Sequence, residues 1–336
     1  MKKELSMAPS TLVGQNRAFL MGISILAVLC AHQSWIPHSW LLNFNRLVVG
    51  PVFLAVFFYV SGFGLSFSLR KHTLRVYYLR RFVRLLPVCV VCGIIKILLD
   101  NYGPACIQDS STTSASSLHT EWWTVLGLDL WFIRYIIVLY LVAPLLFQAV
   151  RRWGEAVFWA SIPVSLVFVW LLSGYPIAFQ PFLYLPIFVS GMAFGLGKFR
   201  LRKVGALLSV VLFLAYSALI LASQFQLIGF SHDLADNFCI YIFVPYWTWL
   251  WAWVGSKLKS CHCDRPFVWM GGCTLELYLL HEFIYHCVFN GLEPGREWHF
   301  LVALALSFLT AFLVNKVVAF YNHSIVAISH PRSPQS

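Results

Sequence analysis

The chain is built from long apolar runs separated by short polar segments, and within the runs apolar residues are continuous rather than alternating. Continuous apolar runs of about 20 residues are typical of helices that cross a bilayer, whereas the strands of a membrane barrel alternate apolar and polar positions. The pattern therefore predicts an all-α, polytopic transmembrane bundle of about ten helices: 18–36, 48–69, 85–100, 127–149, 156–173, 182–197, 204–223, 238–255, 267–289 and 299–320.

Composition leads to the same class. Hydrophobic residues make up 60% of the chain and charged residues only 11%, with a mean hydropathy of +0.75. Soluble domains carry roughly twice that charged fraction. An ordinary soluble domain is therefore excluded, and the lipid bilayer is the expected surrounding of the chain.

The basic residues indicate how the helices are oriented. Loops on the cytoplasmic side are enriched in Lys and Arg, and alternate segments here hold 20 of the 24 basic residues. These are Lys2, Lys3, Arg17, Arg70, Lys71, Arg75, Arg80, Arg81, Arg84, Arg151, Arg152, Lys198, Arg200, Arg202, Lys203, Lys257, Lys259, Arg265, Lys316 and Arg332. Both termini are thus predicted to be cytoplasmic, and the net charge of +11 reflects topology rather than nucleic-acid binding.

The chain reads as one membrane domain over 1–336, with a cytoplasmic N-terminal segment (1–17) and a cytoplasmic tail (321–336). The first apolar run lacks a cleavage-type site, so we expect that helix to be retained. The longest predicted loop, 101–120, lies outside and is rich in Ser and Thr.

Cysteines and glycines give no cofactor motif. Cys89 and Cys92 lie in an apolar run, and the Cys261-His262-Cys263 spacing is too tight for a zinc half-site. We expect packing roles for most of the nine cysteines and predict no metal. Gly62-Phe63-Gly64 lacks the features of a dinucleotide loop and favours close helix packing instead.

His32 is the first candidate for chemistry. No charged residue separates it from Arg17, so in a continuous helix the two lie roughly 22 Å apart and His32 is at membrane depth. Ionisable groups at that depth usually face a bundle interior or a water-filled cavity and are often functional. The alternative is a neutral histidine that is hydrogen-bonded between helices.

Other ionisable residues fall at similar predicted depths. His281 lies 14 residues beyond Phe267, as His32 lies 14 beyond Ala18, and Arg134 follows the outer end of its helix. These groups are candidates to line one polar cavity that opens outward. Further charges in or near the membrane are Asp129, Lys96, Glu276 and Glu282.

A histidine of ordinary pKa is a suitable general base near neutral pH. Arginine binds phosphate well because its planar guanidinium donates two parallel hydrogen bonds, which makes the arginine-rich segment 70–84 a candidate phosphate site. The alternative for that segment is attraction to anionic lipid headgroups.

Five stretches, in order, resemble the acyltransferase 3 family of bacterial inner-membrane proteins: MGISILAVLCAH, VFFYVSGFGLSFSLRK, YYLRRFVRLLP, LWFIRYIIVLYLVAPLL and MGGCTLELYLLH. The resemblance implies transfer of an acyl group, often acetyl, from cytoplasmic acyl-coenzyme A to a hydroxyl, commonly of a sugar or surface polysaccharide, on the outer side. It implies a multi-pass protein of the bacterial inner membrane.

The resemblance also implies residue roles. His32 matches the family's first-helix histidine, and His281 the histidine that closes its last motif. The basic residue common eleven positions before the first histidine is replaced by Met21, and Arg17 is its candidate substitute. Arg80, Arg81 and Arg84 match an arginine segment that precedes a proline, here Pro87.

Together these observations predict that Arg80, Arg81, Arg84 and Arg17 hold the donor phosphates, and that His32 takes the acceptor proton. Arg134 or a backbone amide stabilises the oxyanion. His281 and Glu276 are supporting candidates, and the alternative for both is a hydrogen-bonded packing role. An acyl-histidine intermediate is the alternative to direct transfer.

Two other functions stay open at this point. A transporter or flippase of a lipid-linked sugar would also use buried charges, and the Met21 departure allows an inactive family member. The acceptor, the acyl length and the oligomeric state are not specified by the sequence.

Overall fold

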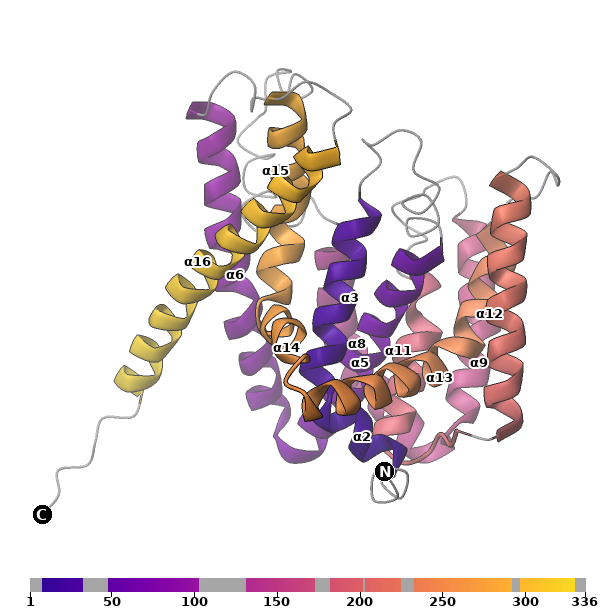
Figure 1. The fold of residues 1–336 in the computed structure, drawn as a ribbon. Helices are drawn as coiled ribbons and strands as arrows, with labels where there is room; N and C mark the ends of the chain where they lie inside the picture. Colours follow the sequence, from indigo (N-terminus) through magenta and orange to yellow (C-terminus); the bar gives the residue numbers. More distant parts are fainter. Residues whose placement is uncertain are drawn as a thin grey trace, which may run out of the picture. The chain divides into compact units, whose positions relative to one another are not determined.

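A computed structural model describes residues 8–32, 48–102, 131–172, 182–201, 203–224, 233–291 and 297–329. These residues form helices without any strand, which confirms the all-α prediction for this part of the chain. The helices are α2 (Pro9–Gln15), α3 (Arg17–Ala31), α5 (Gly50–Lys71), α6 (Leu74–Tyr102), α8 (Trp131–Trp153), α9 (Ala156–Leu171), α11 (Leu185–Gly195), α12 (Lys203–Gln224), α13 (Asp233–Ser260), α14 (Arg265–Gly272), α15 (Thr274–Gly291) and α16 (Glu297–Ser329) (Figure 1). Most of the predicted outer loop and Asp129 lie outside the described residues.

Several of these helices are long and apolar enough to cross a membrane. They are α5, α8, α12 and α16, and the bent pair of α2 and α3, with 67° between them, passes the same test as one broken span. Each of the ten predicted spans overlaps at least one helix. The count of ten spans and the cytoplasmic termini stay predictions.

Two predicted helix boundaries are wrong. The predicted helix 267–289 is broken, because α14 ends at Gly272 and α15 begins at Thr274. The first predicted helix ends early, since α3 stops at Ala31 and His32 is its C-cap. The equal-depth argument for His32 and His281 required a continuous helix up to each histidine, so it no longer holds for His281.

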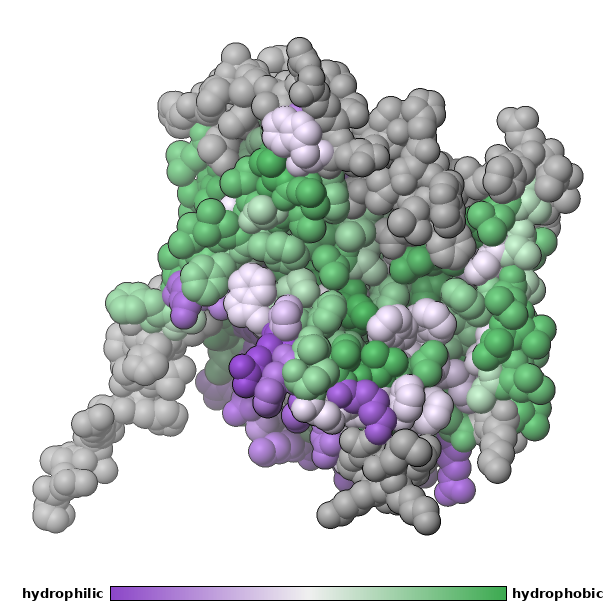
Figure 2. Space-filling view, in the orientation of Figure 1, coloured by the Kyte–Doolittle hydropathy of each residue, from purple (hydrophilic) through white to green (hydrophobic). Residues whose placement is uncertain are grey.

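The helices fall into two compact units. Unit 1 comprises residues 1–79 and 131–274, and unit 2 comprises residues 80–130 and 275–336. In unit 1, apolar residues are exposed along α12, among them Val204, Leu207 and Leu214, as the green surface on one side of Figure 2 shows. Apolar side chains exposed along a whole helix are expected where lipid covers it.

Glycines bring two helix pairs of unit 1 into backbone contact. A Cβ on Gly22 of α3 would overlap the carbonyl oxygen of Phe267, and one on Gly271 of α14 would overlap that of Ala18. Gly62 of α5 and Gly191 of α11 stand in the same reciprocal relation. Small residues permit such close approach between membrane helices. The packing role predicted for Gly62 is therefore confirmed.

Candidate functional site

His32 stands at the end of α3 with its ring fixed by the backbone. Its Nδ1 lies 2.9 Å from the carbonyl oxygen of Val28, one turn earlier. A carbonyl oxygen only accepts, so Nδ1 carries the hydrogen and donates it. In the neutral ring Nε2 then holds the lone pair, and because His32 is exposed, this nitrogen is suited to take a proton.

Arg17 begins the same helix and packs against α5. A Cβ on Gly64 would lie 2.5 Å from the Cζ of Arg17, so the guanidinium rests on the α5 backbone where only glycine leaves room. The 15 residues of α3 place Arg17 roughly 22 Å from His32. These two candidates therefore occupy opposite ends of one helix and do not form a single contact.

Arg134 is in the first turn of α8, partly buried beside an aromatic cluster. Phe58 of α5 is stacked on Tyr184, with ring centroids 4.8 Å apart, and lies 5.1 Å from Tyr135 and 5.4 Å from Phe132. Aromatic pairs at these distances stabilise packing beyond the area they bury. The cluster thus fixes the turn of α8 from which Arg134 projects.

His281 lies in α15 of unit 2 and is only 1% exposed. Its Nδ1 is 2.8 Å from the carbonyl oxygen of Tyr278 and 3.1 Å from that of Leu277. The ring also contacts Tyr285 edge-on, at 5.8 Å between centroids. His281 therefore has the same tautomer as His32, with Nε2 as its basic nitrogen, but it is enclosed by its own helix and aromatic neighbours.

Glu276 also belongs to α15 and is 4% exposed. Its Oε1 accepts a hydrogen bond of 2.8 Å from Nδ2 of Asn315 in α16. The positive charge of Arg84 in α6 interacts favourably with the carboxylate form of Glu276. Five helical residues separate Glu276 from His281, which turns the two side chains about 140° apart. Glu276 therefore links α15 to α16, and it does not lie on the same face of α15 as His281.

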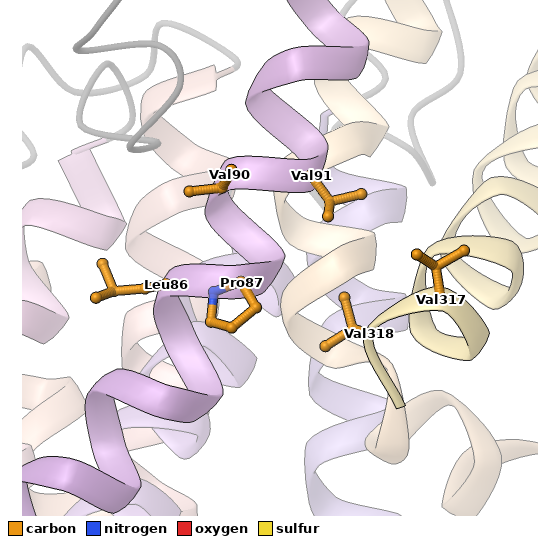
Figure 3. Close-up of a pocket in the computed structure, with 6 residues that line it drawn as sticks. All are labelled: Leu86, Pro87, Val90, Val91, Val317 and Val318. Atoms are coloured by element: carbon orange, nitrogen blue, oxygen red, sulfur yellow. The ribbon is translucent and has the colours of Figure 1, made fainter. Parts of the chain in front are cut away.

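The predicted phosphate-binding arginines follow one another on α6. Arg80 and Arg84, one turn apart, are both exposed, and Arg81 beside them is partly buried. An apolar pocket of about 440 Å³ lies in the same unit (Figure 3), and its first lining residue on α6 comes two positions after Arg84 in the sequence. Its lining residues come from α6 and α16 and are Leu86, Pro87, Val90, Val91, Val317 and Val318. Along α6, unit 2 thus has arginines followed by the residues of an apolar pocket, an order that suits a phosphate attached to a carbon chain.

The structure divides the predicted site residues. His32, Arg17 and Arg134 belong to unit 1, and His281, Glu276 and the three α6 arginines belong to unit 2. Asn315, the partner of Glu276, was missed by the sequence analysis. Its signal is an amide within the apolar run AFLVNKVV, where a polar side chain needs a hydrogen-bonding partner. The predicted roles of all these residues stay predictions.

The helices and their exposed apolar surfaces define a multi-pass membrane protein. A family model, that of an acyltransferase domain, the acyltransferase 3 family, matches residues 19–316. The chain therefore belongs to this family and is a membrane acyltransferase, which confirms the resemblance seen in the sequence. No curated protein matches the chain, and no solved structure matches it.

Proposed function

We propose that this protein is an O-acyltransferase of the bacterial inner membrane. The donor is cytoplasmic acyl-coenzyme A, with acetyl as the first candidate acyl group, and the acceptor is a hydroxyl of a sugar or surface polysaccharide precursor on the outer side. Family membership supports the reaction class. The observation that carries the proposal is the bond from Nδ1 of His32 to the carbonyl oxygen of Val28, because in the neutral ring the lone pair is then on Nε2.

In this proposal the acceptor oxygen attacks the thioester carbonyl carbon while Nε2 of His32 removes the hydroxyl proton. The carbon–sulfur bond breaks, coenzyme A leaves as a thiolate, and the proton passes from His32 to that sulfur. Arg134 is the proposed donor to the oxyanion that develops on the carbonyl oxygen, a contribution typically worth about 3 kcal/mol.

Binding of the donor is assigned to unit 2. Arg80, Arg81 and Arg84 would hold the coenzyme phosphates, since arginine pairs with phosphate through two parallel hydrogen bonds. Their exposure on α6 leaves Arg80 and Arg84 accessible to a soluble ligand. The pocket that follows on the same helix would contact the apolar carbons of the donor.

The test replaces His32 by asparagine. Nδ2 of asparagine can still donate to Val28, but the variant has no atom that takes the place of the basic Nε2. Transfer of label from radiolabelled acetyl-coenzyme A to glycan, measured in membrane vesicles, should fall by about 10²- to 10⁴-fold. His72→Asn is the matched control, because His72 is also a helix C-cap, at the end of α5, and should keep full transfer.

Equal transfer by the parent protein and His32→Asn would remove His32 from the mechanism. If a folded parent protein moves an unmodified lipid-linked sugar across the vesicle membrane and transfers no label, the acyltransferase proposal is wrong and the transporter alternative is correct.

A further inference from the structure

A second pocket lies in unit 1, where α5, α8 and α11 end together. It has a volume of about 400 Å³ and is lined by Leu69, Arg70, Phe147, Arg151 and Leu196. Three lining residues are apolar and two are arginines. Arg70 begins the arginine-rich segment 70–84, but the residues proposed to bind the donor or to act in catalysis (Arg17, Arg80, Arg81, Arg84, His32, Arg134, His281 and Glu276) do not line this pocket.

The two arginines give the pocket a positive charge that its helices do not neutralise. The guanidinium of Arg151 lies over the ring of Phe147, 5.8 Å from its centroid, and this contact holds it beside the apolar residues of the pocket. No aspartate or glutamate occurs in α5, α8 or α11; Glu155 is the first acid to follow, at the start of α9. An anion that enters between Arg70 and Arg151 would therefore meet two positive charges and an apolar floor.

The neighbouring residues indicate the depth of the pocket in the membrane. Trp153 at the end of α8 is 60% exposed, and Trp159 in the first turn of α9 is 52% exposed. Exposed tryptophans gather at the headgroup level of a bilayer. Earlier in α8, on the way from the pocket towards the start of the helix, Leu141 and Leu145 are exposed, as expected for side chains that face lipid chains.

We propose that this pocket binds the phosphate group of an anionic membrane lipid. Arg70 and Arg151 hold the phosphate from two sides, and the apolar floor accommodates the glycerol carbons and the start of the acyl chains. The chains then continue along the exposed leucines of α8. A soluble phosphate ester carries the same anionic group and could also bind the two arginines. The apolar residues of the pocket and the exposed tryptophans near it favour the lipid.

The test counts lipids bound to the full chain by native mass spectrometry in detergent. The probe is dioleoyl phosphatidylglycerol, with dioleoyl phosphatidylcholine as the zwitterionic comparison. Arg151→Gln should weaken phosphatidylglycerol binding about tenfold, which is the loss expected for one charge-assisted hydrogen bond. Arg152→Gln removes the same charge one residue away, outside the pocket, and should change binding less than twofold.

A third variant, Leu196→Trp, fills the pocket without a change in charge, and we expect it to reduce binding as much as Arg151→Gln does. Equal losses in Arg151→Gln and Arg152→Gln would overturn the proposal, since they would indicate diffuse attraction to the basic surface. Displacement of phosphatidylglycerol by inorganic phosphate or adenosine 3′,5′-bisphosphate would also overturn it and assign the pocket to a soluble anion. Unchanged acyl transfer in Arg151→Gln keeps this result separate from the proposed activity.

Discussion

At the scale of single residues, His32 and His281 share a hydrogen bond that fixes the tautomer of the imidazole ring. Each directs Nδ1 to a carbonyl oxygen of its own helix, one turn earlier, so each has Nε2 as its basic nitrogen. They differ in access, since His32 is exposed at a helix end and His281 is buried. The sequence identified both histidines, but neither tautomer could be derived from it, because the tautomer depends on the rotamer that each ring adopts.

The arginines of α6 permit a test that separates donor binding from chemistry. Replacing Arg84 by glutamine should raise the KM for acetyl-coenzyme A about 10- to 100-fold, which corresponds to one lost charge-assisted hydrogen bond. With S-acetylpantetheine, a donor without phosphates, the same variant should transfer as well as the parent. Arg75→Gln is the control, since nine helical residues place Arg75 on the opposite face of α6. A loss that is equally large with both donors would contradict phosphate binding by Arg84.

The bond between Glu276 and Asn315 predicts an effect on stability. Asn315→Leu would leave the buried carboxylate without its amide donor, at a cost of about 1–3 kcal/mol, and should lower the thermal unfolding temperature in detergent. Glu276→Gln keeps an oxygen that accepts the same bond, so its unfolding temperature should change less. If both variants unfold at the parent temperature, the bond does not hold α15 to α16.

At the scale of elements, the pattern of apolar residues located the helices but not the break between α14 and α15. The run from Phe267 to His281 stays apolar across Gly271-Gly272-Cys273, so periodicity alone predicts one helix. At the break, the N–H of Cys273 donates to the carbonyl oxygen of Met270, and the hydroxyl of Thr274 lies 2.9 and 3.2 Å from the carbonyl oxygens of Gly271 and Met270. Such side-chain bonds compete with helical ones, but their formation depends on how α14 packs.

Two adjacent glycines of α14 test the contact with α3. Gly271→Ala places a methyl group against the Ala18 backbone and should destabilise the protein by about 1–3 kcal/mol, because backbone atoms cannot move aside. A Cβ on Gly272 would meet open space, so Gly272→Ala should unfold within a degree or two of the parent. Thermal unfolding in detergent compares the two. Equal unfolding temperatures would contradict the backbone contact.

At the scale of the whole molecule, the sequence predicted the membrane class and the family, since both depend on apolar runs and motif order. It could not predict that the candidate residues fall in two compact units, because that division depends on contacts between helices far apart in the chain. The side of the membrane on which each loop lies is still a prediction, and one turn of unit 1 provides a chemical test of it.

That turn, Cys261-His262-Cys263 between α13 and α14, is exposed. The neighbouring Cys263 thiol, together with the Cys263 backbone N–H, holds the pKa of the Cys261 thiol below its ordinary value, and the interaction between the two thiols raises the pKa of Cys263. More of Cys261 is thiolate at neutral pH, so an impermeant maleimide should label it before Cys263. Cys263→Ala removes the thiol but keeps the backbone N–H, so part of the lowering of the Cys261 pKa is lost and labelling of Cys261 should need a higher pH.

The same reagent tests topology. It should label Cys261 in inverted vesicles and not in sealed spheroplasts, since the basic residues around this turn predict a cytoplasmic position. Labelling from the outside would reverse the predicted orientation of the chain.

The contact of Gly22 and Gly271 with opposing backbone has a mechanical consequence. Where side chains separate two helices, a change of rotamer absorbs small displacements of one against the other. At Gly22 and Gly271 the backbones of α3 and α14 meet directly, so a shift of α14 at this crossing would push on α3. His32, at the end of α3, would then move together with the cysteine turn that precedes α14. A bulky label on Cys261 would in this way displace the proposed catalytic base.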